Sequence, residues 1–381
     1  RNSRWRSSSA LPTFSSPSRC ARPGDPMRLV WGTATRITED APGVQRLIVE
    51  LDDGSAPHVA VAYPELTGRI TAGERVLCNT TAVDLGLGTG GEHIVAARGA
   101  SGIVIDDRAV GHIMKMRYTP LQRDITAVEE EAGPHHATMA SARSLDGMPV
   151  VCCGLHSQVA LVAAAIKRAE PSARVAYVMT DEAALPVAIS RLVPALRDAG
   201  LLDTTITCGQ AFGGDHEAVN RHSGLLAARH VERADIAIIS LGPGIVGTAT
   251  ALGHGGVAQG EAINAAAALG GVPVVALRVS FADARPRHVP VSHQTLSALL
   301  DVALARAIVA VPTLAEPLEA RLHEALEGSG VCARHDCRSV AAAPLPDMRG
   351  VEVSTMGRTA REDPGFFHAA AAAGHLAATL V

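Results

Sequence analysis

Three acidic residues of this chain follow apolar runs of strand type and are the first candidates for chemistry. Asp215 and Glu217 come directly after a glycine pair in the segment AFGGDHEAVN, and Asp181 follows the run VAYVMT. A carboxylate beside a glycine turn can act as a general acid or base, hold a ribose hydroxyl or ligate a divalent cation. We therefore predict Asp181, Asp215 and Glu217 as catalytic residues. A structural role is the alternative, because acids in the first turn of a helix also stabilise the helix dipole.

Glycine-rich turns supply the second kind of candidate, a site for a small anionic ligand. The segment LGPGIVGTAT follows the apolar run IAIIS, and glycines at such a turn leave backbone N–H groups free to face an anion. GPGIVG also matches the dinucleotide pattern G-x-G-x-x-G, but the GHGG that follows interrupts the helix which that pattern requires. The sequence therefore indicates no particular cofactor. The predicted ligand-binding residues are Gly213, Gly214, Gly242, Gly244, Gly247 and Thr248.

Basic residues and thiols are the remaining reactive groups. Arg285, Arg287 and His288 follow a predicted strand and could close over a phosphate or carboxylate, although a solvated loop would have the same composition. The C-x-x-H-x-C spacing at 332–337 is that of a zinc knuckle without a second pair of ligands nearby, so we predict no metal site. Seven cysteines, an odd number spread along the chain, do not form a disulfide framework and fit a reducing cytosol.

The order of the elements predicts an α/β fold, with a doubly wound, mostly parallel sheet and a small N-terminal β-barrel. Short alternating apolar runs separated by turns fill residues 27–100 and predict the barrel. Over residues 148–345, predicted strands alternate with segments whose apolar residues repeat with the period of a helix. This order is typical of a parallel sheet covered on both faces. Because ligands bind at the carboxyl ends of such strands, the polar strand ends predict one binding edge. The remaining segments are a disordered or non-native leader at 1–26, a connection at 101–147 and a tail with an Ala-rich helix at 346–381.

Two local expectations bear on the candidate residues. The strand at 204–208 leads into a predicted helix at 215–231, which places the glycine pair and its acids after the carboxyl end of that strand. The three consecutive acids at 129–131 are typical of a solvated face. Both expectations depend on local pattern alone.

Composition limits the classes of partner. A net charge of −4 and an aromatic content of 3% provide neither a basic field nor stacking platforms, so we do not expect nucleic acid as a partner. No apolar run reaches the roughly 18 residues that cross a bilayer, so we expect no membrane span. A small anionic ligand is the expected partner, and a homo-oligomer stays open.

Several longer stretches of the sequence resemble a known family. They include TDEAALP at 180–186, TITCGQAFGGDHEAVN at 205–220, LGPGIVGTAT at 241–250 and EDPGFFHAAAAAG at 362–374. From Met27 onward the chain is similar to the bacterial domain-of-unknown-function family 3866, found mainly in actinobacteria and firmicutes. The resemblance implies a cytoplasmic bacterial protein and supports leaving the first 26 residues out of the fold. It carries over no activity, cofactor or catalytic residue.

Two classes of function remain open at this point. The first is an enzyme acting on a small anionic or phosphorylated metabolite, with the glycine turn holding the anion and the three acids as acid/base groups or cation ligands. The second is a non-catalytic module, which senses a nucleotide-like ligand or serves as a scaffold in a larger assembly. An enzyme requires carboxylates and a proton carrier within hydrogen-bond reach of a shared point, whereas a binding module requires only donors.

Overall fold

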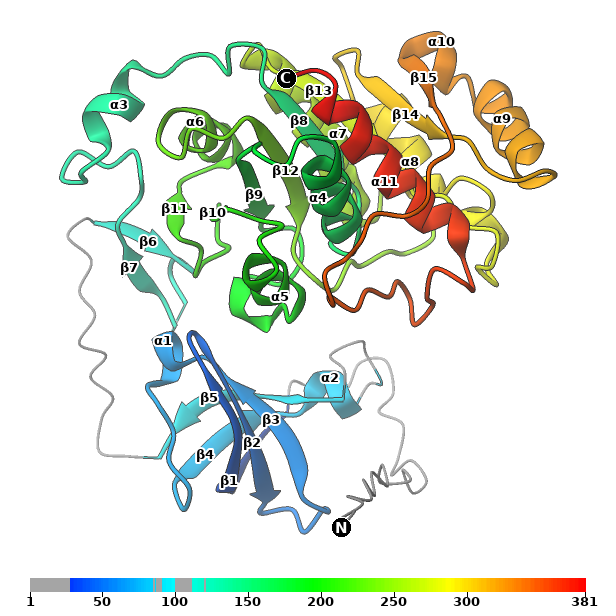
Figure 1. The fold of residues 1–381 in the computed structure, drawn as a ribbon. Coiled ribbons are helices and arrows are strands. Elements are labelled where there is room, and N and C mark those ends of the chain that lie inside the picture. The colour runs from blue at the N-terminus through cyan, green and yellow to red at the C-terminus, as the bar shows by residue number, and fades with distance from the viewer. Residues whose placement is uncertain (1–27, 85, 87–90, 100–111, 120) are drawn as a thin grey trace, which may run out of the picture. The chain divides into compact units, whose positions relative to one another are not determined.

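The computed structural model describes residues 28–84, 86, 91–99, 112–119 and 121–381 (Figure 1). The chain divides into two compact units, Arg1–Val104 and Ile105–Val381. Within the described residues, no helix has both the length and the apolar character needed to cross a membrane.

The first unit contains a closed barrel of five strands, which confirms the predicted β-barrel. Its elements are β1 (Leu29–Ala41), β2 (Val44–Leu51), β3 (His58–Ala62), α1 (Pro64–Thr67), β4 (Arg75–Asn79), α2 (Thr81–Asp84) and β5 (His93–Arg98). The strands follow the order β1-β2-β3-β5-β4, and only the pairing of β3 with β5 is parallel. Side chains at alternate positions fill the interior, among them the fully buried Leu47, Val49 and Val76. The turn between β2 and β3 uses Gly54 at φ +76°, a conformation that glycine adopts readily.

The second unit is built on a sheet of eight parallel strands, which confirms the predicted α/β fold. The strands are β8 (Pro149–Cys153), β9 (Val175–Thr180), β10 (Thr204–Cys208), β11 (His216–Ala218), β12 (Ile236–Leu241), β13 (Val272–Ala276), β14 (Ile308–Pro312) and β15 (Asp336–Val340). Their order in the sheet is β11-β10-β9-β12-β8-β13-β14-β15. The central strands are buried on both faces, which is why their sequences are continuously apolar rather than alternating.

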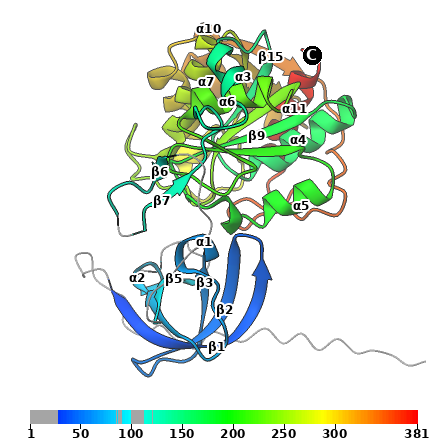
Figure 2. The same ribbon diagram turned by 90° about the vertical axis from the view of Figure 1, so that its left-hand side faces the viewer.

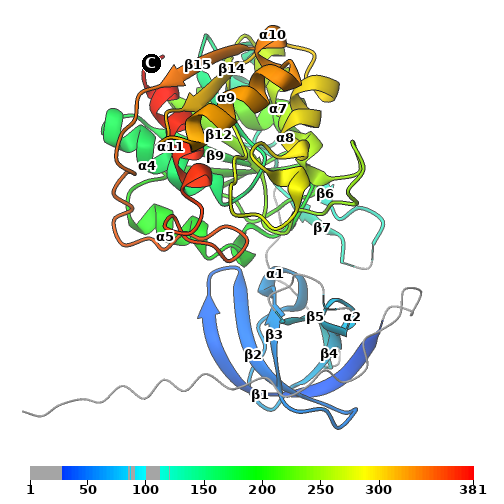
Figure 3. The same ribbon diagram turned by 90° about the vertical axis from the view of Figure 1, so that its right-hand side faces the viewer.

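Helices cover both faces of this sheet, and Figures 2 and 3 show the two layers from opposite sides. One face packs against α4 (Gln158–Ala169), α5 (Leu192–Asp198) and α11 (Pro364–Ala378). The other face packs against α6 (Arg221–His230), α7 (Ala258–Ala268), α8 (His293–Ser297), α9 (Leu318–Ser329) and α10 (Val331–Arg334). The Ala-rich α11 lies beside α4, and at Gly374 the two helices approach so closely that a Cβ would overlap the carbonyl oxygen of Val162.

A topological switch point lies at the centre of the sheet. Strand β8 stands between β12 and β13, and the chain leaves β8 through α4 toward β9 on one side. The chain leaves the adjacent β12 through α7, on the opposite face, toward β13 on the other side. In open α/β sheets the carboxyl ends of strands at such a point are where ligands bind.

Strand β11 is the main departure from the predicted elements. The helix predicted over 215–231 is wrong in its first part, because residues 216–218 pair in parallel with β10 and α6 follows only afterwards. Asn220 separates the two elements, since its side chain caps two N–H groups in the first turn of α6. The chain between β10 and β11 returns to the amino end of the sheet, so Asp215 does not lie at the carboxyl edge.

The segment that precedes the sheet covers the edge strand β11. It forms the hairpin of β6 (Ile113–Lys115) and β7 (Arg123–Ile125), followed by α3 (His136–Ser141). Glu129 accepts a hydrogen bond from Val219 N at 3.0 Å, and Glu130 is 5% exposed and accepts one from Ala127 N at 3.1 Å. The expectation of a solvated acidic face is therefore wrong for these two residues. Their contacts help to cover an edge that would otherwise be open to other strands.

Candidate functional site

Asp215 lies at the amino end of the sheet, where structural contacts occupy its carboxylate. Its Oδ2 accepts hydrogen bonds from Thr205 N at 2.8 Å and Thr205 Oγ1 at 2.9 Å, and Arg197 forms an ion pair with it. Burial acts to raise the pKa of Asp215, but the hydrogen bonds from Arg197 and Thr205 outweigh it and leave the pKa lowered. Asp215 therefore joins α5 to the start of β10 as an ionised group.

Glu217 lies on the edge strand and pairs with a buried lysine. Its Oε2 accepts hydrogen bonds from Lys115 Nζ at 2.5 Å and Thr207 Oγ1 at 2.7 Å, and its Oε1 accepts one from Gly213 N at 2.7 Å. Lys115 is 1% exposed and also donates to the carbonyl oxygens of Thr207 and Ala211. These contacts tie β11 to its covering hairpin and to the turn after β10.

Asp181 follows β9 at the carboxyl edge and fixes the turn after β10. Its Oδ2 accepts a hydrogen bond from Gln210 N at 2.8 Å, and it occupies the space that a Cβ on Gly209 would need. Asp181 and Asp215 thus lie toward opposite ends of neighbouring strands. The structure does not bring the three predicted acids to one point, and their catalytic role stays a prediction.

Three of the backbone N–H groups in the two predicted glycine turns already have acceptors within the protein. Gly213 and Gly214 donate to side-chain oxygens of β11 and β10, at 2.7 and 3.1 Å. In the second turn Thr248 N donates to Gly253 O at 2.9 Å. Occupied donors of this kind do not leave a ready cradle for an anion.

Close packing explains two of the glycines in the second turn. A Cβ at Gly242 would lie 2.7 Å from Ala184 O, and a Cβ at Gly247 would lie 2.8 Å from Gln294 Nε2. Gly244, at φ +90°, is exposed and has open space where a Cβ would lie. Helix α7 begins several residues later, so no helix N-terminus follows this turn directly. The binding of an anion by the predicted glycines and Thr248 stays a prediction.

A different group of residues gathers at the carboxyl edge around Arg278, which follows β13. Arg278 is 5% exposed, and its NH1 donates a hydrogen bond to Gln294 Oε1 at 2.5 Å. The described part of the chain places no carboxylate oxygen within 4.0 Å of its guanidinium nitrogens. Burial lowers the pKa of Arg278 to about 10, and the charge of Arg285 acts in the same direction. The guanidinium is therefore still a cation at neutral pH.

Two of the arginines near Arg278, Arg285 and Arg358, have carboxylate partners. Asp283 pairs with Arg285 at 2.8 Å and with Arg358 at 3.3 Å. Asp363, which is 1% exposed, pairs with Arg358 at 3.2 Å. Two carboxylates thus pair with two arginines, and neither of them forms an ion pair with Arg278.

His254 places an unpaired acceptor in this group. The residue is 5% exposed, and its Nε2 lies 2.9 Å from Ala251 O, which assigns the proton to Nε2. Its Nδ1 is buried and has no hydrogen-bond partner among the described residues. A Cβ at Gly256 would lie 3.0 Å from this nitrogen, so the glycine leaves the space next to His254 Nδ1 unfilled.

Two further histidines complete the group. His288 is 2% exposed, and its Nδ1 lies 2.7 Å from Ser292 Oγ. The ring of His293 lies 5.1 Å from that of His288 and 5.4 Å from that of His254. Burial, followed by the charge of Arg278, lowers the pKa of His288 to about 4, so its ring is neutral at pH 7. We call Arg278, His254, His288, His293 and Gln294 the Arg278 cluster.

Sequence reasoning found only part of this cluster. It marked His288, Arg285 and Arg287 as a loop that could close over an anion, and the structure puts His288 in the cluster. It missed Arg278 and His254. A signal was present for Arg278, because an arginine directly after the apolar run VPVVAL marks a strand end.

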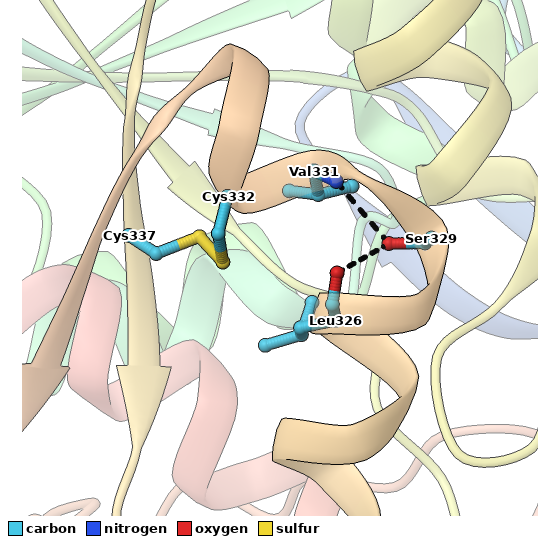
Figure 4. Close-up of a disulfide and its surroundings, with 5 residues drawn as sticks. All are labelled: Leu326, Ser329, Val331, Cys332 and Cys337. Atoms are coloured by element: carbon cyan, nitrogen blue, oxygen red, sulfur yellow. Dashed lines mark hydrogen bonds between the residues drawn. A yellow bond between two sulfur atoms is a disulfide. The ribbon is translucent and has the colours of Figure 1, made fainter.

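One pair of cysteines departs from the expectation of reduced thiols. Cys332 and Cys337 form a disulfide that joins α10 to β15 (Figure 4). His335, between them, is buried and lies with Nε2 2.9 Å from Leu299 O. Among the residues that the structure describes, no group of three or more His, Cys, Asp or Glu could hold a metal ion.

Comparison with known proteins adds a family to this geometry. The family model described as "Protein of unknown function (DUF3866)" matches residues 59–374. No curated protein and no solved structure matches the chain. The matched span includes the entire eight-stranded sheet and the Arg278 cluster.

Proposed function

This chain belongs to the DUF3866 family of proteins of unknown function, and we propose that it binds a small anionic ligand at the carboxyl edge of its sheet, with Arg278 as the main contact. The observation that carries the proposal is the buried guanidinium without a carboxylate partner among the described residues. A buried charge without a counter-ion is several kcal/mol less favourable than a paired one. An anionic ligand would supply the missing charge.

The donors of Arg278 suit a carboxylate or a phosphate. A guanidinium carries five N–H donors in a planar fork, and the bond to Gln294 uses one of them. Two parallel hydrogen bonds to a planar carboxylate or to two phosphate oxygens need that fork. The neutral histidines of the cluster add hydrogen-bonding groups without adding charge, and the switch point between β8 and β12 is where such ligands bind in α/β sheets.

A thermal-shift titration with inorganic phosphate and with short carboxylates tests the proposal. A ligand at 100 times its dissociation constant stabilises the folded protein by about 2.7 kcal/mol. We expect a shift with the wild-type protein and none with Arg278→Gln. The matched control is Arg361→Gln, an exposed arginine on the same segment as Arg358, which should keep the shift.

The same variant gives a second readout with the opposite sign. Without any anion, Arg278→Gln should melt at the wild-type temperature or above it, because the substitution removes an uncompensated buried charge. A wild-type protein that shifts with none of these anions would contradict the proposal. An equal shift in Arg278→Gln would contradict it as well.

Anion binding at this edge serves either class of function named at the outset. An enzyme would turn over an anionic metabolite there, and a sensing module would only hold it. Incubating the protein with phosphate esters and measuring released phosphate separates the two classes once a binding anion is found. Acid/base roles for Asp181, Asp215 and Glu217 belong to the first class.

A further inference from the structure

A second polar group at the carboxyl edge consists of Ser190, His156 and Tyr177. His156 follows β8, Tyr177 lies on β9 and Ser190 follows a short 3-10 turn after β9. His156 Nε2 lies 2.7 Å from Ser190 Oγ, and its Nδ1 lies 3.0 Å from the Tyr177 hydroxyl. Ser190 is 3% exposed and Tyr177 is fully buried. Two consecutive hydrogen bonds therefore link a serine, an imidazole and a group that orients the imidazole.

The hydrogen-bond network assigns the proton of the imidazole. The Tyr177 hydroxyl donates to Leu241 O at 3.3 Å, so it accepts the N–H of His156 Nδ1. Nε2 then carries the lone pair and accepts the hydroxyl proton of Ser190. Burial lowers the pKa of His156 to about 4, so this nitrogen is unprotonated and can accept a proton at neutral pH.

We propose that Ser190 is a nucleophile, that His156 is its general base and that Tyr177 positions the imidazole, in an acyl-transfer or ester-hydrolysis site. Ser190 Oγ forms a bond to the acyl carbon of an ester, the bond to the leaving alkoxide breaks, and the serine proton passes through His156 Nε2 to that alkoxide. Water then attacks the acyl carbon, gives a proton to His156 and displaces Ser190, which takes the proton back. Activation of serine by an adjacent imidazole is a general route to such chemistry.

A second serine in the chain supplies an internal comparison. Ser292 Oγ lies 2.7 Å from His288 Nδ1, and like Ser190 it accepts an N–H from the helix turn that follows it. Among the described residues, however, no hydrogen bond orients the other nitrogen of His288. The third group thus distinguishes Ser190 from Ser292. Ser190, His156 and Tyr177 share no residue with the Arg278 cluster.

A small alkyl fluorophosphonate tests the proposal on the full chain. In this reaction Ser190 Oγ bonds to phosphorus, fluoride leaves and the serine proton passes through His156 to solvent. We expect one adduct per chain by intact mass, mapped to Ser190 by peptide analysis and absent from Ser190→Ala. His156→Ala should react at least about 100-fold more slowly, which is the usual effect of removing a general base. Added imidazole should restore part of that rate.

Tyr177→Phe keeps the ring and removes the orienting hydroxyl. We expect it to react more slowly than wild type and faster than His156→Ala, with an unchanged circular dichroism spectrum. The wild-type map decides the proposal even if a variant fails to fold. An unmodified Ser190 in the folded wild-type protein would overturn it, and so would an adduct on Ser292 in its place. A rate that is the same in His156→Ala as in wild type would overturn the role of the imidazole.

Discussion

Replacing Glu217 by Gln separates a structural from a catalytic role for this predicted acid. The substitution keeps the size of the side chain but leaves the ammonium of Lys115, which is 1% exposed, without its counter-charge. The new amide group also meets a donor in either orientation, because one carboxylate oxygen faces Lys115 and Thr207 and the other faces Gly213 N. Both effects act on the folded state only.

The expected loss follows from the burial of this pair. Removing one partner of a buried ion pair destabilises a protein by about 3 to 5 kcal/mol. The side chain of Glu217 is 15% exposed, so we take the lower end and expect a loss of about 3 kcal/mol. The double variant Lys115→Met with Glu217→Gln should recover part of the loss, because no unpaired charge remains.

Urea unfolding followed by circular dichroism measures these free energies. Glu131→Gln is the matched control, since Glu131 is exposed, and it should stay within about 0.5 kcal/mol of wild type. The reasoning would be refuted if Glu217→Gln unfolded with the wild-type free energy. If that variant also lost turnover of a substrate, Glu217 would act in catalysis as first predicted.

Three further outcomes follow from the geometry. Burial, together with the charge of His58, lowers the pKa of His93 from 6.5 to about 4, so the unfolded chain binds more protons between these values. The free energy of unfolding of the barrel should therefore be highest above pH 6.5 and fall by up to about 1.4 kcal/mol per pH unit toward pH 4. Melting curves of His93→Phe should lack this dependence on pH. Gly374→Ala should lower the free energy of unfolding by about 1 to 3 kcal/mol, because its Cβ overlaps Val162 O, whereas Gly328→Ala in the open part of α9 should raise it by up to about 1 kcal/mol. Asp215→Asn should lower the melting temperature only slightly, because its ion pair with Arg197 is more than one-third exposed, and it should leave any anion-dependent shift unchanged.

The sequence predicts the elements of the two units because their apolar periods are strong. Runs such as IAIISL and PVVCC are long enough and apolar enough to mark strands that are buried on both faces. Strand β11 lacks this signal, since HEA is three residues long and its only fully apolar member is Ala218. Its partner is β10, and a pairing between strands is not written in the local pattern of either one. Because the pattern predicts β11 as part of a helix, it also predicts Asp215 at the carboxyl end of the sheet, whereas Asp215 lies at the amino end.

The Arg278 cluster was harder to predict for a related reason. Each member is ordinary in its own segment, since His254 stands in a glycine-rich turn and Arg278 ends an apolar run. Only the strand order, with β8 between β12 and β13, brings the loop after β12 next to the end of β13. Long-range topology of this kind is set by packing of the whole unit, so spacing along the chain does not reveal it.

The hydrogen bonds of each charged group distinguish the acids of this unit from Arg278. The carboxylates of Glu217, Asp215 and Asp363 accept several short hydrogen bonds, so a ligand that approached them would have to break existing bonds. The guanidinium of Arg278 donates a hydrogen bond to Gln294 and forms no ion pair with a described carboxylate, so the proposed anion would displace no carboxylate from it. On this criterion, the proposed anion would bind first at Arg278, and the acids keep the surrounding strands in place.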